Sequence, residues 1–184
     1  MADLKITELA ALTVVNDEDL IAIVDDPTGT ASTKKIRTDD FQSTWHVGAR
    51  VYNNADLTIT TGEWINLTFN SEDFDTDTIH DTSTNTDRLM CKTAGVYLAV
   101  FNARFDTNAT GERQAQIRLD DTTPLSYMIA FSEATTNATF LLTVVLELSV
   151  NQFLTARVNQ SSGGNLNIDS TSGVSPYFSM HRIG

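Results

Sequence analysis

The stretch Gln114-Ala115-Gln116-Ile117-Arg118-Leu119-Asp120 carries an apolar side chain at every second position. Successive side chains of a β-strand point to opposite faces of a sheet, so this alternation predicts a strand with one face in a core. The preceding run Gly95–Phe105 is also predicted to be a strand, and its apolar residues fall on both of its faces. These two runs therefore predict strands of one antiparallel β-sandwich.

Three more strands are predicted towards the carboxyl terminus, at Thr139–Leu148, Gln152–Asn159 and Ser175–Gly184. A domain built only of such strands is a sandwich, a jelly roll or a barrel. The chain has 184 residues, which allows one domain of ordinary size and a small appendage. We therefore predict an all-β protein with a single sandwich-like domain.

The composition excludes several classes of partner. The net charge is −12, and the 12 basic residues are scattered along the chain, so we expect no binding to nucleic acid. No run approaches the 18 apolar residues of a membrane span, so we expect no membrane insertion. The first residues lack a basic start followed by an apolar run, so we expect no secretory signal and assembly in a cytoplasm.

Residues 1–45 differ in character from the rest. Leu20–Val24 and Thr33–Arg37 are predicted to form a β-hairpin around a turn that contains Pro and Gly. This segment is too small to hold a core of its own, so its apolar side chains must pack on the sandwich, on a sister chain or on a larger assembly. We place the domain boundary here, with an arm at 1–45 and a head at 46–184.

The arm resembles the amino-terminal segment of tailed-bacteriophage virion proteins. The resemblance rests on three pieces in order: Leu4-Lys5-Ile6-Thr7-Glu8-Leu9, then Asp19-Leu20-Ile21-Ala22-Ile23-Val24-Asp25, then Thr33-Lys34-Lys35-Ile36. It implies a module that attaches a fibre, spike or decoration protein to the particle, and hence a location in the virion with other virion proteins as partners. The implied attachment residues are Leu4, Ile6, Leu9, Leu20, Ile23 and Ile36.

Val47–Gly184 resembles the jelly roll of tumour necrosis factor and of the globular heads of the first complement component. The matching features are Gly95-Val96-Tyr97, Leu141–Leu148 with the polar turn that follows it, and the closing run Ser175–Met180. The resemblance implies a compact homotrimer with an aromatic and aliphatic face on the three-fold axis. The candidate interface residues are Trp64, Tyr97, Phe101 and Phe178, of which Tyr97 and Phe101 are predicted to be core or trimer-axis residues. Trp64 alternates with Ile65, Leu67 and Phe69, so it is predicted to lie opposite the core, at an interface or as an exposed binding aromatic.

The acidic run Glu72–Asp77 is the strongest local charge feature. Its candidate calcium ligands are Asp73, Asp75 and Asp77, but the run lacks the glycine and the distal acid of an EF-hand loop. Charge runs of this kind are usually solvated, and we therefore predict no metal site.

No chemistry is signalled elsewhere. The single cysteine, Cys91, is predicted to be a core or boundary thiol, and the three histidines lie far apart in the sequence. No nucleophile elbow, phosphate loop or paired cysteine motif is present. The many acids leave a glycosidase-type pair of carboxylates open as an alternative, but no pattern singles out such a pair. We predict a protein that needs no cofactor and is not an enzyme.

The sequence thus predicts a trimeric head displayed on a phage particle, as capsid decoration, head fibre or tail fibre. Whether it binds a glycan or a protein of the host surface is left open. The alternative is a carbohydrate-binding, lectin-like module outside any virus, which would not need the first 45 residues.

Overall fold

The computed structural model describes residues 20–25, 32–37, 46–131, 135–170 and 176–184. The chain divides into two units, Met1–Trp45 and His46–Gly184. Every regular element in the described part is a β-strand, which confirms the predicted all-β class. The same part of the chain holds no helix that could cross a membrane.

The first unit contains the predicted hairpin. β1 (Leu20–Asp25) pairs antiparallel with β2 (Ser32–Arg37) along its whole length. Of the candidate attachment residues, three lie on these strands, namely Leu20, Ile23 and Ile36. The other three fall outside the described residues, namely Leu4, Ile6 and Leu9.

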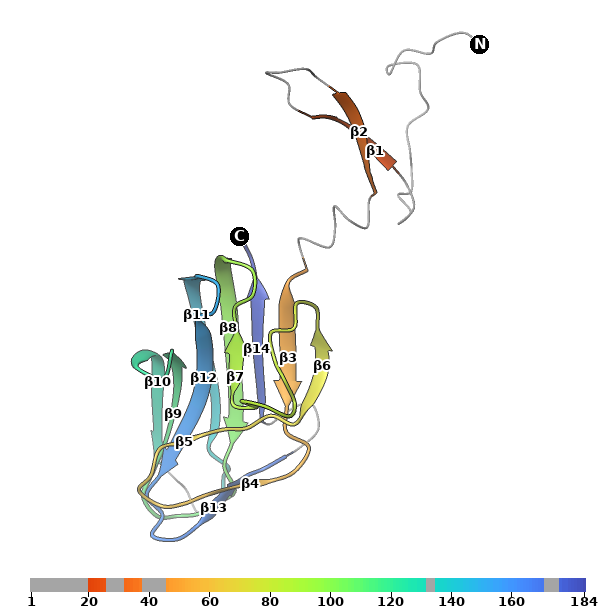
Figure 1. The fold of residues 1–184 in the computed structure, drawn as a ribbon. Coiled ribbons are helices and arrows are strands. Elements are labelled where there is room, and N and C mark those ends of the chain that lie inside the picture. Colours follow the sequence, from red (N-terminus) through yellow and green to blue (C-terminus); the bar gives the residue numbers. More distant parts are fainter. Residues whose placement is uncertain (1–19, 26–31, 38–45, 132–134, 171–175) are drawn as a thin grey trace. The chain divides into compact units, whose positions relative to one another are not determined.

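The second unit is built on two larger sheets that face each other (Figure 1). The first sheet has the strand order β11 (Thr139–Leu148), β8 (Gly95–Arg104), β14 (Tyr177–Arg182), β3 (Gly48–Tyr52) and β6 (Ser71–Asp75). The second has the order β10 (Thr123–Phe131), β9 (Glu112–Leu119), β12 (Phe153–Gln160) and β5 (Ile65–Asn66), and β7 (Arg88–Met90) also pairs with β12. A small separate sheet joins β4 (Leu57–Ile59) to β13 (Leu166–Ile168).

The predicted strands correspond to β8, β9, β11, β12 and β14. The bounds of β11 are those predicted, and the other strands differ by one or two residues at their ends. One long strand, β10, was not predicted. Its sequence begins with Thr123-Pro124 and then runs through several consecutive apolar residues, so it lacks the alternation that marks a strand with one buried face.

The turn between β11 and β12 carries the chain from the first sheet to the second. The backbone N–H of Gln152 donates to the carbonyl of Ser149 at 3.1 Å. Asn151 closes this turn with a φ of 72°. Asparagine tolerates the left-handed region better than most residues, so it serves here where a glycine would otherwise be expected.

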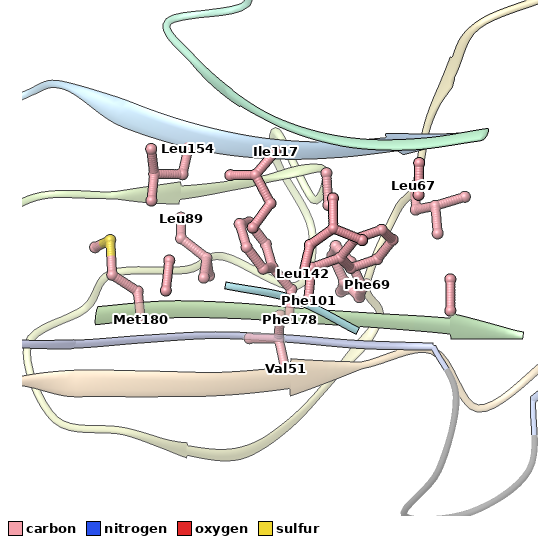
Figure 2. Close-up of a cluster of buried hydrophobic side chains, with 14 of the residues drawn as sticks. Val51, Leu67, Phe69, Leu89, Phe101, Ile117, Leu142, Leu154, Phe178 and Met180 are labelled. Carbon is pink, nitrogen blue, oxygen red and sulfur yellow. The ribbon is translucent and has the colours of Figure 1, made fainter. Parts of the chain in front are cut away.

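The core lies between the two sheets and follows from the alternation in the strands. Residues Tyr97, Ala99, Phe101 and Ala103 of β8 are fully buried, whereas the residues between them are half-buried. Figure 2 shows Phe101 and Val51 of the first sheet facing side chains of the second sheet such as Leu154. Burying one such side chain stabilises the fold by roughly 1.5–3 kcal/mol, so this layer supplies the main stabilising term.

Two loops at one end of the sandwich pack together closely. Gly111 adopts a φ of +76°, and a Cβ atom added there would lie 2.1 Å from the carbonyl oxygen of Ser161. The backbone N–H of Glu112 donates to the Ser161 hydroxyl at 2.8 Å. Gly163, in the neighbouring loop, has a φ of +85° with nothing within 4 Å of its added Cβ.

These two glycines provide a matched test. Gly163→Ala should lower the free energy of unfolding by about 1 kcal/mol, since only the left-handed backbone penalises the alanine. Gly111→Ala should cost about 3 kcal/mol or more, because the steric overlap with Ser161 adds to the same backbone penalty. Chemical denaturation of both variants measures the difference. Equal losses would contradict the close approach of the two loops.

Candidate functional site

Three carboxylates of the acidic run, those of Glu72, Asp73 and Asp75, bind groups of the same chain. Asp73 pairs with Arg50. Asp75 accepts hydrogen bonds from the backbone N–H groups of Asp77 at 3.1 Å and of His80 at 2.8 Å, so it stabilises the start of the loop after β6. The three candidate calcium ligands therefore do not converge, and the described residues hold no group of three His, Cys, Asp or Glu side chains suited to a metal ion.

The buried side chain of His80 stabilises the loop that follows β6. Its side chain is fully buried, with Nδ1 2.8 Å from Oε1 of Glu72 and Nε2 3.3 Å from the carbonyl oxygen of Thr86. Because both ring nitrogens face oxygen atoms of the chain, the imidazole holds the two ends of the loop together. His181 lies apart on β14, where its ring is 5.4 Å from that of Phe74 and burial lowers its pKa.

A pocket of about 390 Å³ opens between this loop and β7. The pocket, called the Lys92 pocket below, is lined by Thr78–Asp81, Thr84, Asn85, Arg88, Met90 and Lys92. No motif in the sequence marks it, because its wall combines an irregular loop with a three-residue strand. The only sequence feature that points to this pocket is the position of Arg88 and Lys92, which follow a long stretch without lysine or arginine.

Three of the four candidate interface residues lie in the wrong place for an interface. Tyr97, Phe101 and Phe178 each have 0% of their surface exposed within a single chain. Phe101 and Phe178 pack edge to face in the core with ring centroids 6.0 Å apart (Figure 2). They point between the sheets because they fall on the inner positions of their strands, so they cannot line a contact between subunits.

The outward side of the β11–β8–β14–β3–β6 sheet carries the apolar surface instead. Leu141 and Val145 of β11 are 54% and 59% exposed. Val145 lies opposite Leu98 of β8, which is half-buried, and Val100 follows on the same side. We call this surface, which comprises Leu98, Val100, Leu141 and Val145, the open face. A charged pair, Arg50 with Asp73, lies near its far edge.

Trp64 lies on the outward side of the other sheet, as its alternation with buried Leu67 and Phe69 predicted. The guanidinium of Arg157 lies 4.5 Å from the centre of its ring system, and the Tyr127 ring is 6.2 Å away. Gln116 holds that guanidinium through two hydrogen bonds of 2.9 and 2.7 Å. Trp64 is half-buried by its own chain and has a stacked cation as its nearest partner.

Cys91 is a core thiol, as predicted. It has no exposed surface, and its Sγ lies 3.2 Å from the carbonyl oxygen of Thr93. Burial raises the pKa of Cys91, and it also raises the pKa of Tyr97, whose hydroxyl donates to the same carbonyl. A buried thiol with a raised pKa is a poor nucleophile.

Comparison with known proteins identifies the fold. No family model and no curated protein matches the sequence. The globular domain of zebrafish complement 1qA protein matches with a TM-score of 0.54 and 17% identity, over 75% of this chain and 98% of that one. The sandwich is a jelly roll of the tumour-necrosis-factor and complement type.

Two further structures agree with this assignment. Murine APRIL at pH 8.0 matches with a TM-score of 0.58 and 8% identity, over 75% of this chain and 99% of that one. Eiger TNF from S. frugiperda matches with a TM-score of 0.56 and 12% identity, over 76% and 93%. The fold implied by the sequence resemblance is thereby confirmed, and at these identities the likeness concerns the fold alone.

The burial of Cys91 predicts its reactivity. A thiol-specific reagent should leave the folded protein unmodified and should label it fully once denaturant unfolds it. Raising the pH from 7 to 9 should accelerate labelling of the unfolded chain, whose thiol has a pKa of about 8.5, but not of the folded chain, whose thiol stays protonated. Absorbance assays of thiol modification measure both rates. Rapid labelling of the native protein would contradict the core position.

Proposed function

We propose that this protein is a homotrimeric structural component of a tailed-bacteriophage particle. Residues 46–184 form a rigid head displayed on the virion, and residues 1–45 attach it to other virion proteins. The protein assembles in the host cytoplasm and serves as capsid decoration, head fibre or tail fibre. The open face is the observation that supports the homotrimer. The sequence pattern of residues 1–45 supports the location in the virion.

The open face has the properties of an association surface. Monomeric proteins rarely expose contiguous apolar patches, and such patches commonly mark association sites. Leu141 and Val145 are more than half exposed on β11, which is the edge strand of its sheet. Beside them, Leu98 and Val100 extend the apolar area onto the neighbouring strand β8.

The exposed apolar residues continue around that edge onto β10. Met128 and Phe131 are 41% and 77% exposed, and β10 lies against β11 at the same side of the sandwich. One subunit can therefore offer this edge to the open face of the next. Such a contact joins two different surfaces of the subunit, so it is heterologous. If each subunit is rotated by a third of a turn relative to the one before it, three such contacts close into a trimeric ring.

The proposed role is display and not catalysis. In the described part of the chain, Glu72, Asp75 and His80 hold the loop after β6 in place, and the thiol of Cys91 is buried. A trimer presents three copies of each surface feature at once, so weak contacts to a host surface act together by avidity. Function then depends on rigid presentation, which the sandwich supplies.

The second candidate is a carbohydrate-binding module outside any virus. The observation that favours it is the aromatic pair Trp64 and Tyr127 on the outward side of the second sheet. That module would not need residues 1–45. Its encoding gene would also lack capsid, portal or tail genes as neighbours, and this separates the two candidates.

Charging the open face should prevent assembly. The wild-type protein should have about three times the mass of a 20.2 kDa chain in light scattering at micromolar concentration. In the double variant Leu141→Asp and Val145→Asp, an unpaired charge would be buried at each contact, at a cost of about 3 kcal/mol or more than a hundredfold in the dissociation constant. We therefore expect a folded monomer.

Thr68→Asp is the matched control, since it adds an exposed acid away from the open face. It should leave the mass unchanged. A wild-type monomer, or a double variant with the mass of a trimer, would contradict the proposed interface.

Removing the arm should separate folding from attachment. A chain that begins at His46 should fold and keep its oligomeric state, because it forms a unit of its own with its own core. It should no longer join phage particles assembled in cells that produce it. Occupancy is measured by quantifying the protein in purified virions. Normal occupancy of the truncated protein would place attachment in the head.

A further inference from the structure

The Lys92 pocket lies where the edge strand β7 is covered by the loop after β6. The backbone N–H of Met90 donates to the carbonyl of Ile79 at 2.8 Å, which fixes the loop to the strand. On its other side β7 pairs with β12, so the floor of the pocket is anchored in the second sheet. A volume of about 390 Å³ falls in the range of small-ligand sites.

Two cations line this pocket in a chain whose net charge is −12. Lys92 is exposed, and among the described residues its ammonium contacts only the sulfur of Met90, at 3.4 Å. Arg88 is held in place because its guanidinium lies 4.3 Å from the centre of the Phe153 ring and 3.5 Å from Asp87. Within the described part of the chain the ammonium of Lys92 therefore has no carboxylate partner, whereas the guanidinium of Arg88 is already paired with Asp87.

The acid in the pocket wall does not neutralise these cations directly. The Asp81 carboxylate accepts hydrogen bonds from the hydroxyl of Ser83 at 2.6 Å and from the backbone N–H of Thr84 at 3.1 Å. These bonds, above all the one from the Ser83 hydroxyl, lower the pKa of Asp81. His80 also lines the pocket, but its ring nitrogens face Glu72 and Thr86.

The remaining wall combines hydrogen-bonding and apolar groups. Thr78, Thr84 and Asn85 offer hydroxyl and amide groups, and Ile79 and Met90 offer apolar surface. Thr78 has a φ of 51° and Asn85 a φ of 52°. A β-branched residue rarely adopts this region, and such strained positions concentrate at ligand sites.

We propose that the Lys92 pocket binds a saccharide that carries a carboxylate. Lys92 and Arg88 pair with the carboxylate, Thr78, Thr84 and Asn85 hydrogen-bond to ring hydroxyls, and Met90 packs on the apolar face of the ring. A neutral sugar would leave the ammonium of Lys92 without an anionic partner. A polyanion such as nucleic acid would meet repulsion from the acidic remainder of the chain.

This inference deepens the proposed display function, since it names the class of surface molecule that the head would recognise. It does not depend on the trimer, because every residue of the pocket comes from one chain. Binding and oligomeric state can therefore fail independently, and light scattering on the same samples records the second.

The methionines give a direct test. The full chain contains four, Met1, Met90, Met128 and Met180, and among the methionines that the structure describes Met90 alone lines the pocket. With 13C-methyl methionine in the full-length protein, titration with glucuronate should shift the Met90 resonance to saturation and leave Met180 in the core unchanged. Glucose provides the same ring without the charge, and acetate provides the charge without the ring. Both should bind at least about tenfold more weakly.

Two variants assign the effect to the pocket. Lys92→Gln should weaken glucuronate binding about tenfold or more, since it removes a charged hydrogen-bond donor. Arg104→Gln removes one positive charge at the far end of β8 and should leave the affinity within about twofold, as expected for a distant screened charge. An unshifted Met90, equal binding of glucose or acetate, or an unchanged Lys92→Gln variant would each overturn the proposal.

Discussion

The packing of Phe178 against Phe101 and Phe69 determines how the head is built. Phe178 of β14 has ring centroids 6.0 Å from both partners, and all three side chains are fully buried. This cluster fixes which side of β8 and β14 faces inward. The apolar side chains on the opposite side of β8, such as Leu98, then have no place in the core. Because β8 is apolar on both sides and only one side can face the core, its other side forms an open apolar face.

That consequence also explains where sequence reasoning succeeded and where it failed. Alternation located β9 well, because this strand has one polar face that fixes the register. In β8 both faces are apolar, and nothing in the local pattern says which one is internal. The aromatic residues Tyr97 and Phe101 were therefore assigned to the interface, although large aromatics fill a core between two sheets more effectively. β10 was missed for a related reason, since an edge strand with exposed apolar residues has no polar face to reveal its period.

The pocket could not have been predicted from the sequence by the same means. Its shape depends on hydrogen bonds such as those from the loop backbone to Asp75, and on the contact of His80 with Glu72. The sequence suggested that the carboxylates of this run were either solvated or bound to calcium. Asp75 instead binds backbone N–H groups, and Asp73 binds Arg50. Acids that serve as loop caps look the same in sequence as acids that bind a metal, because both need short carboxylate side chains close together.

The distribution of charge is compatible with the proposed self-association of an acidic chain. Chains with a net charge of −12 repel one another. At an ionic strength of about 0.1 M, salt screens this repulsion between charges that lie more than about 10 Å apart. On the open face, Leu98, Val100, Leu141 and Val145 are uncharged, and the nearby Arg50 and Asp73 neutralise each other. Apolar contact limited to these four residues would bury no charge, while Glu147, which is exposed on the same side of β11, has to stay in solvent at the rim. The acidic surface would then act at longer range, where it would keep assembled heads apart and leave the Lys92 pocket as the proposed local site for an anion.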